Sequence, residues 1–260
     1  MKSSRIVIAL TVAFSTVSFS QANDFNQEIR VGIADLNDTD DNFFGVGYQY
    51  YFKDVELKQT AWEISPYLQR VDSVNVDYFK INEVSRLQVS GEIFFQNNWV
   101  IRPRFSRIAD DDDSNIRIGT DVGQFIQDNW EVGVGVDYFK SDSRFDFDEN
   151  DDFSFSVYTR YITLERNSVA FKPGWDLELQ GTILGEDSSL VASAGYYFSP
   201  KFSLYGGVTQ IDRERRSSTT AINLGTNYWF NRSFSINFGL GVDAGGDGLR
   251  SADLLASYRF

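Results

Sequence analysis

The chain has 260 residues and a formal net charge of −13 at pH 7, with 23 Phe and 13 Tyr but no Cys and no His. The missing cysteines exclude disulfides, thiolate metal sites and a lipid-modified cysteine, and the missing histidines exclude imidazole bases and imidazole metal ligands. The acidic balance argues against a nucleic-acid partner, because phosphate binding needs a basic face. We therefore expect no enzyme, no cofactor and no bound metal.

Residues 1–22 are predicted to be a secretory signal peptide. Lys2 and Arg5 give a positive start, residues 6–14 form an apolar stretch, and Ser20-Gln21-Ala22 has the small-x-small pattern of a cleavage site. The apolar stretch is too short to span a membrane as a helix. The mature chain is predicted to begin at residue 23 and to form a single domain over residues 23–260.

Strict alternation of apolar and polar residues runs through the mature chain. In the segment 233–243 every second residue is Phe, Ile, Leu or Val, and Ser, Asn, Gly and Asp stand between them. Residues 131–138 and 153–161 alternate in the same way. A period of two indicates a strand with one apolar and one polar face. No later apolar run is long enough for a membrane-spanning helix, so a membrane form would have to be a closed barrel.

Fourteen such segments can be counted, and they predict an all-β fold: a transmembrane, antiparallel, up-and-down β-barrel. The region 53–80 holds two short candidate strands. We merge them into one strand over 66–81 after a connector over 53–65, because bacterial single-chain barrels have even strand numbers. Counts of twelve and sixteen stay open. The predicted segments are 25–35, 42–52, 66–81, 84–96, 98–108, 114–126, 129–140, 151–164, 168–183, 188–199, 201–212, 217–230, 232–243 and 249–260.

Two kinds of connection alternate along the chain. Tight connections flanked by aromatic residues occur at 94–99, 125–130, 197–202 and 228–232. Longer acidic or Gly-rich connections occur at 36–42, 109–115, 141–152, 212–217 and 244–248. This sorting predicts short periplasmic turns beside an aromatic girdle, and longer outer loops. The acidic runs 110–113 and 146–152 lack the spaced ligands and the Gly of a calcium loop. They are predicted either to be solvated loop tips that repel one another, or to be bridged to lipopolysaccharide by diffuse divalent cations.

The end of the chain carries a resemblance to a known class. Apolar or aromatic residues alternate over 250–260 and finish on Tyr258 and Phe260. This pattern resembles the closing strand of bacterial outer-membrane β-barrels, in which the last strand is also read by the barrel assembly machinery. The resemblance implies that Tyr258 and Phe260 are an assembly signal. It also implies that the protein lies in the outer membrane of a Gram-negative bacterium, in contact with lipids and lipopolysaccharide.

A second resemblance rests on three short motifs. Tyr50-Tyr51-Phe52 ends a predicted strand, a charged connector leads to Trp62-Glu63-Ile64, and Gly195-Tyr196-Tyr197-Phe198 ends a later strand. This arrangement is similar to that of porin-like outer-membrane β-barrels of gammaproteobacteria, a group without characterised function. The connector lacks the Gly-Pro pair of that group.

A barrel of about fourteen strands is wide enough to leave a lumen. The polar face carries charges of both signs, which fits a water-filled pore whose wall selects solutes. In the alternative interpretation these charges pair with one another and brace a plugged or narrow interior, although we expect no segment long enough to form a plug domain. The predicted pore-lining residues are Glu28, Arg30, Gln49, Asp77, Glu92, Arg102, Arg104, Arg117, Asp121, Asp137, Arg160, Asp176, Glu178, Asn223 and Asn237.

The sequence thus favours a monomeric, porin-like channel for passive diffusion of small hydrophilic solutes or ions. A non-conducting structural or surface-interaction barrel is the alternative from another class. A soluble periplasmic β-protein is the third.

Overall fold

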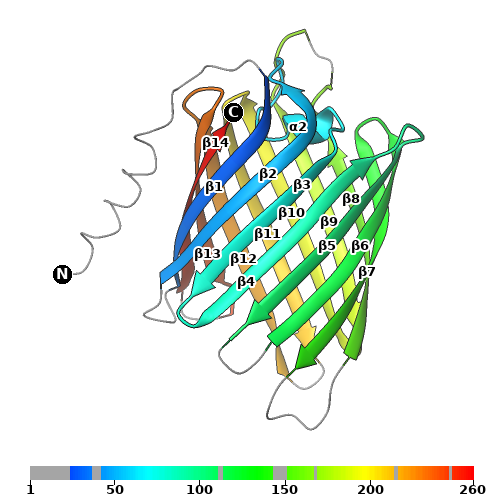
Figure 1. The fold of residues 1–260 in the computed structure, drawn as a ribbon, viewed down its shortest axis with the longest axis vertical. Helices are drawn as coiled ribbons and strands as arrows, with labels where there is room; N and C mark the ends of the chain where they lie inside the picture. Colours follow the sequence, from blue (N-terminus) through cyan, green and yellow to red (C-terminus); the bar gives the residue numbers. More distant parts are fainter. Residues whose placement is uncertain are drawn as a thin grey trace, which may run out of the picture.

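In a computed structural model the chain forms a closed barrel of fourteen antiparallel strands, each paired with its neighbours in sequence (Figure 1). β1 also pairs with β14, which closes the ring. The predicted fold and the predicted count of fourteen are confirmed. The structure describes residues 24–36, 42–110, 114–142, 151–166, 169–213, 216–245 and 248–260. The predicted signal peptide and most of the two acidic runs, 111–113 and 146–150, lie outside the described residues.

The strands are nine to fifteen residues long, and one short helix interrupts their succession. The elements are β1 (Asp24–Leu36), β2 (Asn42–Glu56), α2 (Ser65–Leu68), β3 (Ser73–Ile81), β4 (Val84–Phe94), β5 (Trp99–Ala109), β6 (Ser114–Gln127), β7 (Trp130–Asp142), β8 (Asp151–Ile162), β9 (Gly174–Leu184), β10 (Asp187–Ser199), β11 (Phe202–Arg213), β12 (Arg216–Trp229), β13 (Phe234–Asp243) and β14 (Gly248–Arg259). The described residues include no helix that could cross a membrane.

The two ends of the barrel differ. We call the end at which β1 begins and β14 finishes the turn end, and the opposite end the loop end. The four tight, aromatic-flanked connections all lie at the turn end, as predicted. Two turn-end connections are long, however: 57–72, which includes α2, and 163–173. At the loop end, the β3–β4 and β9–β10 connections are two-residue turns.

The polar face of the strands points inward and the apolar face outward. Directly paired residues share a face, so Asp137 of β7 lies beside Gly119 of β6 and Ser154 of β8. Asp137 is 3% exposed, whereas Phe155 and Val157 are 63% and 62% exposed. Charged groups inside and bare apolar side chains outside are the reverse of a soluble protein and suit a barrel surrounded by hydrocarbon. The predicted alternation is confirmed.

Main-chain and side-chain bonds join the two ends of the chain. The carbonyl oxygen of Phe260 accepts hydrogen bonds from the backbone N–H groups of Asn26 and Gln27, at 3.2 and 3.1 Å. Inside the barrel, Arg259 Nε lies 2.5 Å from Glu28 Oε2. The chain's last residues are therefore part of the barrel closure.

The predicted strand over 66–81 is wrong in its first half, because β3 begins only at Ser73. Pro66 stands in the first turn of α2, where its fixed φ angle and missing N–H favour a helix start. Arg70 has a positive φ of 53°, which turns the chain after the helix. The residues before Ser73 consequently do not extend the sheet and fold into the barrel mouth instead.

Candidate functional site: the barrel interior

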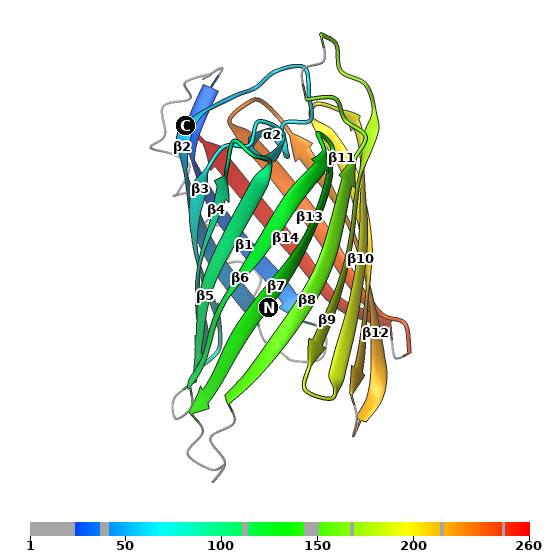
Figure 2. The same ribbon diagram turned by 90° about the vertical axis from the view of Figure 1, so that its right-hand side faces the viewer.

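Residues 57–72, which we call the inward segment, lie across the turn end of the lumen. The backbone N–H of Trp62 donates to the carbonyl oxygen of Pro200, in the β10–β11 turn, at 3.0 Å. The hydroxyl of Tyr67 donates to Glu131 Oε2, on β7, at 2.7 Å. These two partners belong to separate parts of the wall. Figure 2 shows α2 enclosed by the ring of strands at this end. We expected no segment long enough to form a plug domain, and this connection between β2 and β3 nevertheless occupies part of the lumen at the turn end.

Apolar packing holds the inward segment against the wall in two clusters. One joins Ala61, Ile64, Tyr67 and Leu68 to the buried wall residues Val100, Phe125, Ile162, Leu164 and Tyr197. The other joins Leu57, Trp62 and Val71 to Phe25, Tyr51, Val55 and Trp229. Phe125, Tyr197 and Trp229, which we assigned to the aromatic girdle, therefore point inward. Their outward neighbours Tyr196, Phe198, Tyr228 and Phe230 form the contiguous ring contacts of a girdle.

Arg102 on β5 is the centre of a buried ionic cluster. Its guanidinium group lies 2.7 Å from Glu92 and makes two contacts, of 2.5 and 3.0 Å, with the carboxylate of Glu131. Glu131 is fully buried and also accepts hydrogen bonds from the hydroxyls of Tyr67 and Tyr158. Burial raises the pKa of the Tyr67 hydroxyl, which keeps its proton available for this bond. The inward segment is thus tied directly to the charged wall.

A second ionic cluster lies on the same wall, nearer the loop end. Arg104 makes two contacts with Asp137, of 2.6 and 2.7 Å, and also binds Asp121. Arg117 lies 2.7 Å from Asp137. All three of the predicted pore-lining arginines Arg102, Arg104 and Arg117 thus contact carboxylates of the same wall.

Glycine residues on the inner face let neighbouring side chains lie flat. A Cβ atom at Gly133 would overlap the ring of Tyr158, and one at Gly225 would overlap the ring of Tyr205. Tyr158 can therefore reach Glu131, and the Tyr205 hydroxyl can donate to Asn237 Oδ1 at 2.7 Å. Both rings therefore lie against the wall.

A cavity of about 270 Å³ separates the inward segment from β9–β12. Three carboxylates, those of Glu63, Asp176 and Glu178, line it without any basic side chain. The other lining residues are Val191, Ser193, Ala194, Gly195, Tyr197, Ser203, Tyr205, Gly206, Gly207, Val208, Thr209 and Asn223. The inward segment therefore does not fill this side of the lumen.

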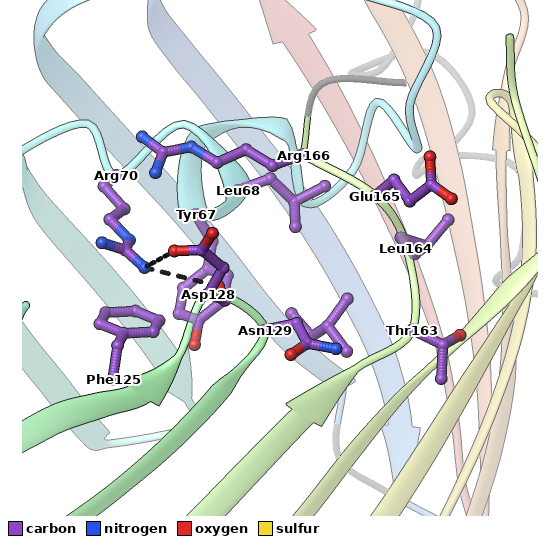
Figure 3. Close-up of a pocket in the computed structure, with 11 residues that line it drawn as sticks. Tyr67, Leu68, Arg70, Phe125, Asp128, Asn129, Thr163, Leu164, Glu165 and Arg166 are labelled. Carbon is purple, nitrogen blue, oxygen red and sulfur yellow. Dashed lines mark hydrogen bonds and ion pairs between the residues drawn. The ribbon is translucent and has the colours of Figure 1, made fainter. Parts of the chain in front are cut away.

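Another cavity, of about 300 Å³, lies between the inward segment and the turn-end connections (Figure 3). Arg70 borders it, with its guanidinium carbon 4.0 Å from the centre of the Phe125 ring and Nη2 3.6 Å from Asp128 Oδ1. Arg166 Nη2 donates to the carbonyl oxygen of Gln69 at 3.3 Å. These contacts hold the inward segment against the turn-end connections that follow β6 and β8.

Glu63 gives the docking of the inward segment a pH dependence. Its Oε2 atom accepts a hydrogen bond of 2.7 Å from Ser203. Burial is the largest influence and raises the pKa of this carboxyl above its ordinary value, against the opposing effects of Ser203 and Arg259; Asp176 and Glu28 also raise it. The docked state therefore binds the proton more tightly than the released state. Docking is strongest below the ordinary pKa and weakens as the pH rises through the raised pKa.

We accordingly expect hydrogen exchange of the amides in 57–72, corrected for the intrinsic effect of pH, to be slower near pH 5 than near pH 8. Glu63→Gln is expected to abolish this difference. Glu83→Gln, which changes an exposed carboxylate in the β3–β4 turn, is the matched control and should leave it intact. Equal protection at both pH values in the unchanged protein would contradict this role of Glu63.

All the predicted pore-lining residues belong to the inner face. Arg30 pairs with Asp77 at 3.0 Å, Arg160 with Asp176 at 2.7 Å, and Gln49 donates to Ser73. The structure brings together Glu92, Arg102, Arg104, Arg117, Asp121 and Asp137 as a contiguous group. Glu28, Gln49, Asn223 and Asn237 lie apart from it.

Sequence reasoning missed several inner residues. Glu131 lies on the polar face of β7 and Asp253 on the polar face of β14. The alternation of polar and apolar residues was therefore enough to predict both. Glu63 and Tyr67 carried no such signal, because the inward segment was assigned to a connector and a strand. The missed residues include the two that tie this segment to the wall.

No protein-family model matches the chain, and no curated protein matches it. Among solved structures, it is similar to the outer membrane protein Omp33 of Acinetobacter baumannii, with 17% identity over 92% of this chain and 100% of that chain and a TM-score of 0.73. It is also similar to a bacterial polysaccharide outer membrane secretin, with 12% identity over 90% of this chain and 98% of that chain and a TM-score of 0.53. The likeness shows that the fold is that of outer-membrane β-barrels.

Proposed function

We propose that the protein is a porin-like channel that lets small hydrophilic solutes and ions diffuse passively across the outer membrane of a Gram-negative bacterium. One observation carries the proposal: a closed fourteen-strand barrel keeps a polar inner face and open cavities beside the segment that crosses it. Barrels of eight strands fill their interior with side chains, whereas wider barrels enclose cavities or channels.

In this proposal the turn end faces the periplasm and the loop end faces the outside. Short periplasmic turns and longer outer loops are the usual arrangement. The leader over residues 1–22 directs export and is removed, and the barrel assembly machinery reads Tyr258 and Phe260. The mature protein acts as a monomer among lipids and lipopolysaccharide, without enzymatic activity.

The inward segment sets the narrowest part of the route. Solutes enter at the loop end, follow the inner face with its paired charges, and pass the inward segment on the β9–β12 side, where the cavity of about 270 Å³ lies. The fifteen charged and polar positions predicted to line the pore form the wall that they meet. A constriction of this kind limits permeation to small solutes.

A non-conducting barrel is the second candidate. The observation that favours it is the apolar packing of the inward segment, in which Ala61, Ile64 and Leu68 are buried against the wall. In that case the segment is a permanent seal, and the barrel is structural or contacts surface partners through its loops.

Liposome swelling separates the two candidates. Vesicles that contain the refolded protein are expected to swell in an isotonic pentose solution and to swell less in an isotonic trisaccharide solution, because the constriction selects by size. Protein-free vesicles give the baseline. If vesicles with folded protein, verified by heat-modifiable gel migration, do not swell in any sugar, passive diffusion of solutes is refuted.

A further inference from the structure

We infer that this channel prefers cations, and that they pass the inward segment through the carboxylate-lined cavity beside β9–β12. The inference rests on the proposed function, since it names the class of ion that the proposed route takes. It comes from how the charges are distributed inside the barrel, and not from the chain's net charge.

Six arginines of the inner face are neutralised where they stand. Arg102 and Arg104 each contact two carboxylates, and Arg117 shares that of Asp137. Arg30, Arg160 and Arg259 pair with Asp77, Asp176 and Glu28. Each of these six guanidinium groups therefore has a carboxylate at contact distance, which leaves it little residual attraction for a passing anion.

Several inner carboxylates stand outside these pairs. Among the residues that the structure describes, Glu63, Glu178 and Asp253 take part in no ion pair. They belong to the inward segment, β9 and β14, which are away from the arginine-rich strands β5 and β6. In the sector of β9–β12, which Glu63 and Glu178 line, the uncompensated charge is thus negative. Arg86, which bonds to the uncharged Gln88, lies on β4, outside this sector.

This sector is also where the lumen stays open beside the inward segment. The cavity there includes Glu63 and Glu178 in its lining, and the inward-facing Gly195 and Gly207 add no side chain to it. On the other side, Tyr67 fills the space between Glu131 and Arg160. An ion that crosses the turn end therefore meets carboxylates and small polar residues rather than guanidinium groups.

The unpaired carboxylates stand at successive depths. Glu63 lies at the turn end beside Ser203, and Glu178 lies four residues into β9 from its turn-end start at Gly174. Asp253 lies five residues from the loop-end start of β14 at Gly248. Fixed charges of one sign along a narrow, low-dielectric route concentrate the opposite ion and repel ions of their own sign. A cation therefore meets attractive positions at more than one depth of the barrel.

The reversal potential across a tenfold KCl gradient tests the inference on the full mature protein in planar bilayers. We expect the permeability ratio of K⁺ to Cl⁻ to be about 5 for the unchanged protein. In the double variant Glu178→Gln/Asp253→Asn it should fall about twofold or more while channels still open. Asp54→Asn, which removes an exposed carboxylate from the outer face of β2, is the matched control and should keep the original ratio.

A ratio of 1 or less in the unchanged protein overturns the inference, and so does an unchanged ratio in the double variant. Both outcomes leave the channel itself standing. The absence of any current from folded protein overturns the proposed function instead.

Discussion

Replacing residues 58–71 with a six-residue Gly-Ser linker is expected to raise the single-channel conductance about threefold or more. The change removes Ile64, Tyr67 and Leu68, which fill the turn end of the lumen. A six-residue linker is long enough to join the end of β2 to Asp72. The backbone N–H of Phe52 already bonds to the carbonyl oxygen of Asp72, and β2 continues for only four residues, or about 13 Å, from Phe52 to Glu56. Current steps in planar bilayers measure the effect.

A point variant provides a milder form of the same test. Tyr67→Ala removes the hydroxyl that binds Glu131 and the ring over which Arg160 lies at 3.9 Å. It is expected to increase the frequency of larger current steps. Tyr196→Ala, on the outer face of β10, is the matched control and should have no effect on conductance. An unchanged conductance after removal of the whole segment would show that the constriction lies elsewhere.

Arg102→Gln is expected to lower the free energy of unfolding by about 3 kcal/mol. The change leaves Glu92 and the fully buried Glu131 without their shared cation, and a buried charge stripped of its partner is costly. Urea unfolding of the barrel in lipid vesicles measures the difference. Arg86→Gln is the matched control, since Arg86 also lies on the inner face but hydrogen-bonds to the uncharged Gln88 and, among the described residues, makes no ion pair.

A second variant separates charge from packing. In Arg102→Gln/Glu131→Gln the isolated buried charge is removed as well, so a substantial part of the lost stability should return. A loss below about 1 kcal/mol in the single variant would mean that water reaches this cluster and screens it.

Alternation in the sequence was enough to predict the barrel and the residues of its inner face. In β13, for example, Asn237 bonds to Tyr205 inside while Phe238 is exposed outside, as the period of two requires. The alternation that predicts a strand is a local pattern, because each residue only has to suit either the inner face of the barrel or its outer, lipid-facing surface. The even count of strands followed from closure.

The inward segment was not predictable in the same way. Trp62, Ile64 and Leu68 alternate with polar residues as in a strand, yet they are buried against the inner wall and not against lipid. Their conformation is decided by tertiary packing, which a local pattern does not contain. Pro66 was the one local sign against a strand, since proline disrupts the pairing of a central strand.

The ion pairs were predictable as a group but not individually. Register places Arg102 directly opposite Asp121, yet Arg102 binds Glu92 and Glu131, and Asp121 binds Arg104. Long side chains lean along the strand, and the strands of a barrel are tilted, so partners are displaced from the directly opposite position. A sequence supplies the charges of a wall, while the tilt of the strands decides which of them meet.

Single-channel recording of the unchanged mature protein in planar bilayers, in symmetrical KCl, tests the proposed channel most directly. We expect discrete current steps that recur at one amplitude, in the direction set by the applied voltage. Folded barrels, verified by their heat-modifiable migration, that insert into the bilayer and carry no current at any voltage would contradict it.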